Sequence, residues 1–342
     1  MFEFEMKNGK FTVLNISDMQ PSECDWDNTN PNSKDVVAAM DHTIRTLIER
    51  VKPDLITVTG DISMATEQPN AYPAFADYME QFGIPWCAVW GNHEQQDVTL
   101  KVEFVNTEYV LPYYRTKKHF FHEDGPKELG NGNYLIEIKH EGNPVHTLFM
   151  MDSHNCVFLP EDDGQLHFYY DKLNEQQLVW YKEQAEMLKA KGCYHSSVLM
   201  HIPCHAYDDA WKAAFKADID PRSIDIMDSY GEDCWNEGYK DSFGMNYEDS
   251  ACYPHEDGVL DALKAGGIAD NVLVGHCHAN NSVIRYEGIR FAYTLKTGKV
   301  RPFYYPLNGG TVITVNADGS SDIRHEYVDI DAYLTDDDKI YH

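Results

Sequence analysis

Residues 85–94 of the chain read PWCAVWGNHE, a short apolar run that passes directly into four residues of a different kind. The run Pro85–Trp90 predicts a buried strand, and Gly91-Asn92-His93-Glu94 follows at its carboxyl end. Two upstream stretches repeat this arrangement, KFTVLNISDMQ at residues 10–20 and DLITVTGDIS at residues 54–63. In each stretch, an apolar run ends in polar residues of the types that bind metal ions.

Helical patterns separate these strands. Apolar residues at 3.6-residue spacing predict a helix over Val36–Val51, with Ser33 as its N-cap and Pro53 just past its end. A second helix is predicted over Pro69–Phe82. The alternation of strands and helices predicts an α/β fold with a largely parallel sheet covered on its faces.

The pattern loosens after residue 100. A hairpin is predicted from Asn133–His140 and Val145–Asp152, and Asn174 with Gln177 has the spacing of a helix capping box. Further strands are predicted at Ser196–Met200, Asn271–Val274, Ile289–Thr294 and Thr311–Val315.

Composition narrows the class of protein. With 342 residues, 43% of them hydrophobic, the chain has material for a sizeable core. A net charge of −28 repels the phosphate backbone, so we expect no nucleic-acid partner. No apolar run is long enough to predict a membrane span, and the first residues resemble a strand rather than a signal peptide. The eight cysteines form no C-x-x-C pair, which favours reduced thiols and a cytoplasmic location.

We expect one domain over residues 1–342, because the sequence contains no repeat or convincing linker. Residues 218–255 differ from the rest, with ten acidic residues, two basic residues and six aromatic residues. The aromatic residues argue against disorder, so this segment is predicted to be an ordered insertion packed over one face.

Polar segments follow five of the predicted strands. In parallel sheets the carboxyl ends of the strands are where ligands bind. The candidate side chains are two carboxylates, two amides and three imidazoles, a set that suits Mn, Fe, Zn or Co. Asp18 and Gln20, like His276 and His278, are two residues apart, which in extended backbone places both side chains on one face. The five segments are Ser17-Asp18-Met19-Gln20, Gly60-Asp61-Ile62-Ser63, Gly91-Asn92-His93-Glu94, Met200-His201-Ile202 and Gly275-His276-Cys277-His278.

The order D-x-[H/Q], G-D, G-N-H-E, a strand-end His and G-H-x-H resembles the calcineurin-like metallophosphoesterase family over roughly residues 10–300. The resemblance implies a four-layer αββα sandwich of two mixed sheets with flanking helices. It also implies two divalent metal ions and a catalytic His93. One ion would be held by Asp18, Gln20, Asp61 and His278, and the other by Asp61, Asn92, His201 and His276.

The chain departs from the family pattern at two points. Gln20 stands where most members have histidine, and Ile62 follows Gly60-Asp61 where purple acid phosphatases have tyrosine. The V-D-R-G continuation of protein Ser/Thr phosphatases is also missing. Neither of those subfamilies is therefore favoured.

Other polar residues lie close to the motifs in sequence. His154, Asn155 and His205 are candidates for contact with substrate. Lys296, Lys299 and Arg301 form a basic cluster that is expected to be a solvated loop face, with phosphate positioning as the alternative.

The sequence thus predicts a dinuclear phosphoesterase acting on a small phosphorylated substrate. A metal-bound hydroxide would attack phosphorus while His93 assists the leaving oxygen. A monoester is favoured over a diester. The alternatives are a phosphodiesterase of the same fold and a non-catalytic metal-binding interaction scaffold.

Overall fold

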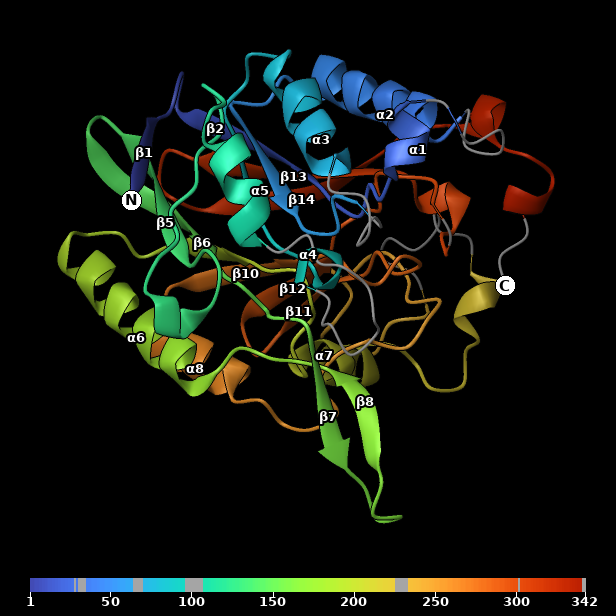
Figure 1. Ribbon diagram of the computed structural model, residues 1–342. Helices are drawn as coiled ribbons and strands as arrows, with labels where there is room; N and C mark the ends of the chain where they lie inside the picture. Colours follow the sequence, from blue (N-terminus) through green and yellow to red (C-terminus); the bar gives the residue numbers. More distant parts are fainter. Residues whose placement is uncertain are drawn as a thin grey trace.

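The computed structural model describes residues 1–27, 29, 35–63, 70–95, 107–224, 233–300 and 302–339 (Figure 1). Ser33, Pro69 and Arg301, which figured in the sequence predictions, lie outside these ranges.

One sheet has five strands in the order β14-β13-β2-β3-β4. The neighbours β2, β3 and β4 run parallel, whereas β13 is antiparallel to both β2 and β14. The parallel strands are those predicted from the first hundred residues, so their carboxyl ends share one edge. Their bounds are β2 Lys10–Ile16, β3 Leu55–Thr59, β4 Trp86–Val89, β13 Gly309–Asn316 and β14 Ser321–Tyr327.

The second sheet has seven strands in the order β1-β5-β6-β9-β10-β12-β11. Its central strands β6, β9, β10 and β12 run parallel, and β5–β6 forms the predicted hairpin. The bounds are β1 Phe2–Glu5, β5 Tyr134–His140, β6 Asn143–Met150, β9 Ser196–Leu199, β10 Ala269–Val274, β11 Val283–Tyr286 and β12 Ile289–Tyr293.

The two sheets pack face to face around a buried apolar layer. Val13, Leu55 and Leu199 in this layer have no exposed surface, nor have Ile136 and Leu273. Helices α2, α3 and α5 share a core with the outer face of the five-stranded sheet. Helices α6, α7 and α8 do the same for the seven-stranded sheet, which completes four layers (Figure 1). The αββα sandwich implied by the resemblance is therefore confirmed.

Helix positions agree closely with the predictions. α2 begins after Asp35, and α6 begins at the predicted capping box, in which Asn174 and Gln177 exchange side-chain and backbone bonds. The α-helices are α1 Glu23–Trp26, α2 Val36–Val51, α3 Ala71–Glu80, α4 Asn92–Gln95, α5 Thr107–Tyr114, α6 Glu175–Ala190, α7 Ala206–Ala214 and α8 Val259–Gly266. Short 3₁₀ turns are η2 Lys127–Leu129, η3 Pro221–Ser223, η5 Tyr305–Leu307, η6 Asp331–Tyr333 and η7 Asp337–Lys339.

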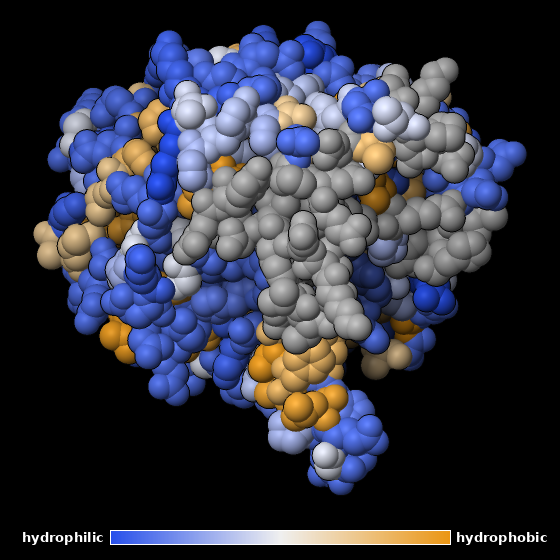
Figure 2. Space-filling model, viewed as in Figure 1, coloured by the Kyte–Doolittle hydropathy of each residue, from blue (hydrophilic) through white to orange (hydrophobic). Residues whose placement is uncertain are grey.

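A two-stranded hairpin that the sequence analysis did not predict projects from the body of the molecule (Figure 1). Its strands are β7 Cys156–Pro160 and β8 Leu166–Tyr170, paired with Phe158 opposite Phe168. Phe158, Leu166 and Phe168 are 44%, 67% and 51% exposed, and Figure 2 shows the apolar patch on this projection. Strands β11 and β14 were also not predicted.

The described part of residues 218–255 packs against the seven-stranded sheet and its helices. Trp235 is completely buried, and its ring lies 5.6 Å from that of Phe215 after α7. Asn246 forms a bridge with Asn280, directly after Gly275-His276-Cys277-His278. The segment thus supports the loop that carries two of the predicted metal ligands. Within the described residues, no helix is both long and apolar enough to cross a membrane.

Candidate functional site

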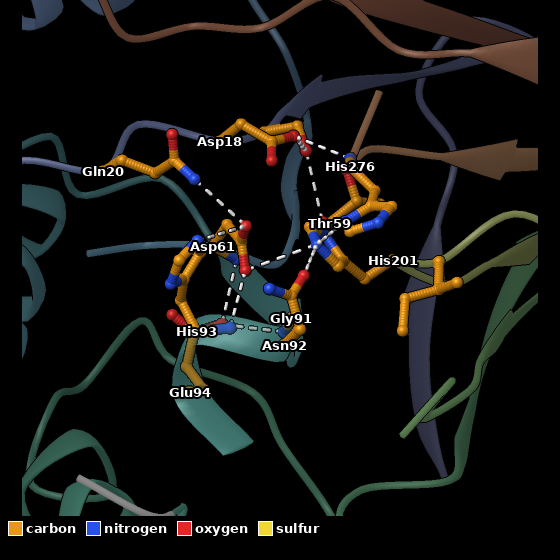
Figure 3. Close-up of polar contacts among 12 residues, drawn as sticks. Asp18, Gln20, Thr59, Asp61, Gly91, Asn92, His93, Glu94, His201 and His276 are labelled. Carbon is orange, nitrogen blue, oxygen red and sulfur yellow. Dashed lines mark hydrogen bonds and ion pairs between the residues drawn. The ribbon is translucent and has the colours of Figure 1, made fainter. Parts of the chain in front are cut away.

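The carboxyl ends of both sheets meet at one place (Figure 3). Asp18, Asp61 and Asn92 follow β2, β3 and β4 of the five-stranded sheet. His201 follows β9 of the other sheet, and the motif with His276 and His278 follows β10. The two sheets therefore supply different chemistry, oxygen atoms from one and imidazole nitrogens from the other. We call Asp18, Asp61, Asn92, His201, His276 and His278 the six-residue cluster.

Asp61 lies at the centre of the cluster and is 1% exposed. Its Oδ1 accepts a bond of 3.0 Å from the His93 backbone N–H and lies 3.3 Å from Nε2 of His201. Its Oδ2 accepts a bond of 3.1 Å from the Gln20 amide and lies 3.7 Å from Nε2 of His93. Both oxygens therefore face residues that the sequence predicted to meet.

Asp18 makes the second link between the sheets. Its Oδ1 lies 3.2 Å from Nε2 of His278, and its Oδ2 accepts a bond of 3.1 Å from the His276 backbone N–H. Asn92 contacts the cluster through its side-chain oxygen, 3.0 Å from Nε2 of His201.

The three imidazoles are oriented for binding through the nitrogen that faces the cluster. His201 and His278 donate Nδ1–H to the carbonyl oxygens of Thr59 (2.6 Å) and Pro302 (2.5 Å). That bond assigns a proton to each Nδ1, so Nε2 is the nitrogen that faces the carboxylates and would bind a metal ion once it carries no proton. His276 faces the cluster through Nδ1, which lies 3.2 Å from Nε2 of His201, while its Nε2 is buried with no hydrogen-bond partner among the described residues.

The backbone at these positions differs from the prediction. The two-residue spacing was interpreted as extended backbone, but Asp18, Gln20, Asp61 and His276 have φ of 54°, 56°, 50° and 70°. Left-handed conformation costs about 1 kcal/mol or more for residues other than glycine. β2, β3 and β10 therefore end in a sharp turn, whereas Asn92 and His201 follow their strands without positive φ. As predicted, Cys277 points away from the cluster and is buried, 3.4 Å from the Ala251 N–H.

Glu94 organises the loops beneath the cluster, a role that the sequence analysis did not assign. Its carboxylate is 1% exposed and accepts three backbone N–H bonds, from Gly91 (2.7 Å), Ile62 (2.8 Å) and Asp61 (2.9 Å). It therefore ties the Gly60-Asp61 turn to Gly91-Asn92-His93-Glu94. Its place in G-N-H-E was the only sequence signal of this role.

The close approach of the Gly60-Asp61 turn also requires glycine at residue 91. A Cβ at this position would clash with Oδ1 of Asp61 and would lie 2.5 Å from the Asp61 backbone nitrogen. Any side chain at residue 91 would therefore displace the central carboxylate.

The charges of the cluster depend strongly on one another. Burial favours a higher pKa for Asp18, but the hydrogen bond and charge of His278 lower that pKa to about 2. Burial opposes protonation of His201, yet the Asp61 and Asp18 carboxylates raise its pKa to about 9. Burial and the nearby His201 lower the pKa of His276 to about 3, so the His276 ring is neutral and can donate a lone pair. Burial and the charge of Asp61 raise the pKa of Glu94 to about 7.

The interpretation of the basic cluster as a solvated face was wrong for its two described members. Lys296 is 4% exposed and Lys299 is 7% exposed. Lys299 donates to the Tyr333 carbonyl oxygen at 2.6 Å, whereas Lys296 points into the site and bonds to Asp18 and Gln20. The segment after β12 lies against the first motif, through a bridge between Ser17 and Lys296, and this burial could not be inferred from composition.

The three candidate substrate residues make hydrogen bonds with residues outside the cluster. His154 is held by Gln177, with Nε2 2.8 Å from Oε1, and Asn155 donates to the Gln95 carbonyl oxygen at 2.5 Å. Gln95 ends α4, so these two residues lie close to the helix that begins at Asn92. The His205 ring is 3.4 Å from the Tyr253 carbonyl oxygen. A substrate role for any of the three stays a prediction.

An aromatic residue missed by the sequence analysis contacts the cluster from the hairpin. The Tyr170 ring at the end of β8 meets the His276 ring edge-on, with centroids 4.1 Å apart. Phe168 and Phe158 continue this row of rings outward, at centroid distances of 5.4 Å and 5.8 Å. The apolar face of the hairpin therefore begins at the site.

Two groups of side chains within the cluster could each hold a metal ion. Asp61, His201 and His276 form one, and Asp18, Asp61 and His278 form the other. In each group the candidate ligand atoms lie within 4.8 Å of one another. Asp61 belongs to both, as expected of a carboxylate between two ions.

Comparison with known proteins agrees with this geometry. The model of the calcineurin-like phosphoesterase family matches residues 11–280, which is most of the chain. The chain therefore belongs to the calcineurin-like phosphoesterase family, whose chemistry uses divalent metal ions and whose members include phosphatases.

The chain is similar to several named proteins. It is 26% identical to phosphatase DCR2 of Saccharomyces cerevisiae over 218 residues, which cover 59% of this chain and 36% of the yeast protein. It is 24% identical over 317 residues to probable inactive purple acid phosphatase 29 of Arabidopsis thaliana, covering 84% of this chain and 71% of the plant protein. Among solved structures, calcineurin-like phosphoesterase YfkN from Bacillus subtilis aligns with a TM-score of 0.43 and 16% identity, covering 92% of this chain and 88% of the other.

Proposed function

We propose that this protein is a dinuclear, divalent-metal-dependent phosphoesterase. The observation that carries the proposal is the pair of ligand groups that share Asp61. One ion would be held by Asp18, Asp61 and His278. The other would be held by Asp61, Asn92, His201 and His276. When bound, two such ions supply the Lewis acidity that activates water and stabilises negative charge on a phosphoryl group.

The residues of the cluster fit a pair of divalent metal ions. The ligand set combines carboxylate, amide and imidazole without sulfur, which suits Mn, Fe, Zn or Co. Nδ1 of His276 lies 3.2 Å from Nε2 of His201, and the bonds made by Nδ1 of His201 and of His278 leave Nε2 of each ring facing the carboxylates.

His93 is the proposed catalytic residue that is not a ligand. Its side chain is 18% exposed, so it faces the site while remaining reachable from solvent. Its backbone N–H fixes Asp61, and its Nε2 lies beside the same carboxylate. A proton held there is placed for delivery to the leaving oxygen of the ester.

We favour a small phosphate monoester as the substrate. The net charge of −28 disfavours an extended polyanion such as nucleic acid, whereas ions in the cluster would attract a compact phosphate group. The same charge, together with the absence of a C-x-x-C pair among the eight cysteines, supports a cytoplasmic enzyme without a nucleic-acid or membrane partner. Because the chain covers 36% of the yeast phosphatase, no substrate is carried over from that protein.

A single domain over residues 1–342 is part of this proposal. β13 and β14 lie beyond the matched range of 11–280, yet β13 pairs directly with β2. The five-stranded sheet therefore needs chain from both ends of the sequence.

A non-catalytic scaffold is the second candidate, because three relatives from Arabidopsis thaliana carry the name probable inactive purple acid phosphatase. Hydrolysis is favoured because His93 and the whole six-residue cluster are present and converge.

Hydrolysis of p-nitrophenyl phosphate and bis-p-nitrophenyl phosphate tests the proposal. Chelator-stripped protein should regain turnover with Mn²⁺, Fe²⁺, Zn²⁺ or Co²⁺, with the monoester preferred. His93→Ala should retain both ions and lose turnover by roughly 10²–10⁴-fold. His195→Ala is the matched control, since His195 pairs with Asp270 at the opposite end of β9. Two bound ions without turnover for either ester would favour the scaffold.

A further inference from the structure

The Lys296 side chain reaches the site from the end of β12. It is 4% exposed, and its Nζ donates to the Asp18 carbonyl oxygen at 2.8 Å and to Oε1 of Gln20 at 2.5 Å. Both acceptors are neutral oxygens, and both belong to the first motif. The ammonium therefore brings a buried positive charge directly beside the cluster.

These contacts determine the orientation of the Gln20 side-chain amide. An ammonium group has three donors and no acceptor, so only the oxygen of the amide can face it. The amide nitrogen then faces Oδ2 of Asp61, to which it donates at 3.1 Å. Figure 3 shows the nitrogen directed toward Asp61 and the oxygen directed away.

The opposite orientation of the amide is disfavoured at both ends. It would place the NH₂ group against the Lys296 ammonium, donor against donor. It would also place the amide oxygen against the Asp61 carboxylate, acceptor against acceptor. Both partners are buried, so water does not relieve either conflict.

We infer that Gln20 is a positioning residue rather than a metal ligand, and that Lys296 holds it in this role. The inference rests on the proposed metal site and changes the ligand set that the family resemblance implied. An amide NH₂ group has no lone pair available for a metal ion. The position between Asp18, Asp61 and His278 is then held by three side chains, and Gln20 instead fixes the shared carboxylate.

The visible absorption spectrum of Co²⁺-loaded protein tests this assignment, because it reports the atoms bound to the metal and needs no turnover. The probe is Co²⁺ alone, added to chelator-stripped protein. Gln20→Leu should leave the Co²⁺ spectrum and the stoichiometry of two ions unchanged. His278→Gln, which alters a cluster residue, should change the spectrum.

Lys296→Met gives a second and opposite test. Without the ammonium, the amide is free to turn its oxygen toward the metal, so the Co²⁺ spectrum should change. In the double variant Gln20→Leu/Lys296→Met the change should disappear. Lys299→Met is the matched control, since Lys299 is also buried but donates to the Tyr333 carbonyl oxygen, and it should give the wild-type spectrum.

A spectrum altered by Gln20→Leu alone, with one ion lost or bound at least tenfold more weakly, would overturn the inference while leaving the proposed function intact. Failure of the wild-type protein to bind Co²⁺ would instead overturn the proposed function. If Lys296→Met does not fold, the Gln20→Leu spectrum still decides between a ligand and a positioning residue.

Discussion

Gly91→Ala is predicted to disable the site while leaving the fold in place. Gly91 lies between β4 and α4, and an added Cβ would lie 2.5 Å from the Asp61 backbone nitrogen and closer still to its carboxylate. Real Cβ contacts begin at about 3.0 Å and are ordinary from 3.4 Å, so the two turns must separate by roughly 0.5–0.9 Å. The backbone angle at Gly91 is not in the left-handed region, so the clash is the whole effect.

The expected loss of activity follows from the central position of Asp61 in the cluster. A misplacement of about 1 Å in a catalytic group lowers turnover on the order of 10²-fold. The shift also stretches the bond from the Gly91 N–H to Glu94, which links the same two turns. We therefore expect about a 10²-fold loss of kcat and weaker binding of both ions, with thermal unfolding still cooperative.

The assay compares kcat for p-nitrophenyl phosphate, metal content by elemental analysis and the thermal midpoint. Gly83→Ala is the control, because Gly83 has φ of 64° and an added Cβ would meet no atom of the described residues within 4 Å. That variant should lose roughly 1 kcal/mol of stability and keep its activity. The reasoning fails if Gly91→Ala keeps kcat within threefold of wild type, or if Gly83→Ala loses activity equally.

Two further predictions concern other parts of the molecule. Tyr170→Ala should lower kcat/KM for p-nitrophenyl phosphate roughly 2–10-fold, because it removes the ring that packs against His276. Tyr170→Phe keeps the ring and should remain near wild type. Equal losses in the two variants would argue against a role for the ring. His325 is buried, and burial lowers its pKa to about 4 from 6.5 in the unfolded chain. As the pH falls, the unfolded chain therefore takes up a proton at this residue before the folded protein does. The free energy of unfolding should fall as the pH drops from 6.5 toward 4. Between pH 8 and pH 5 this loss is about 2 kcal/mol, and it should be absent from denaturant unfolding of His325→Gln; identical pH slopes for the two proteins would contradict it.

The motifs at the strand ends predicted much of the site, because parallel strands place the residues that follow them at the same edge of a sheet. Apolar runs such as Leu55–Thr59 can be recognised in sequence, and parallel strands end at a common edge whatever their side chains. The cluster could therefore be assembled before any distance was known. The resemblance added what spacing could not, namely that the fold contains two mixed sheets packed face to face.

Other features could not be predicted from local sequence. The left-handed turns at Asp18 and Asp61 are one example, because nothing in the spacing distinguishes them from extended backbone. The burial of Lys296 depends on contact with residues 278 positions earlier in the chain. The hairpin of β7 and β8 was missed because Cys156–Pro160 reads CVFLP, with no polar residue to mark the alternation typical of a half-buried strand.

The division of the cluster between the two sheets has a consequence for how the protein matures. The oxygen donors and the imidazoles are each complete within their own sheet, and neither set forms the cluster until the sheets have docked face to face. Metal uptake would therefore come late in folding and would fasten one sheet to the other. A chain whose two sheets had docked out of register would keep its secondary structure but would not bind the metal ions. In a preparation that contains both forms, the metal content per chain would therefore give the fraction of correctly assembled molecules.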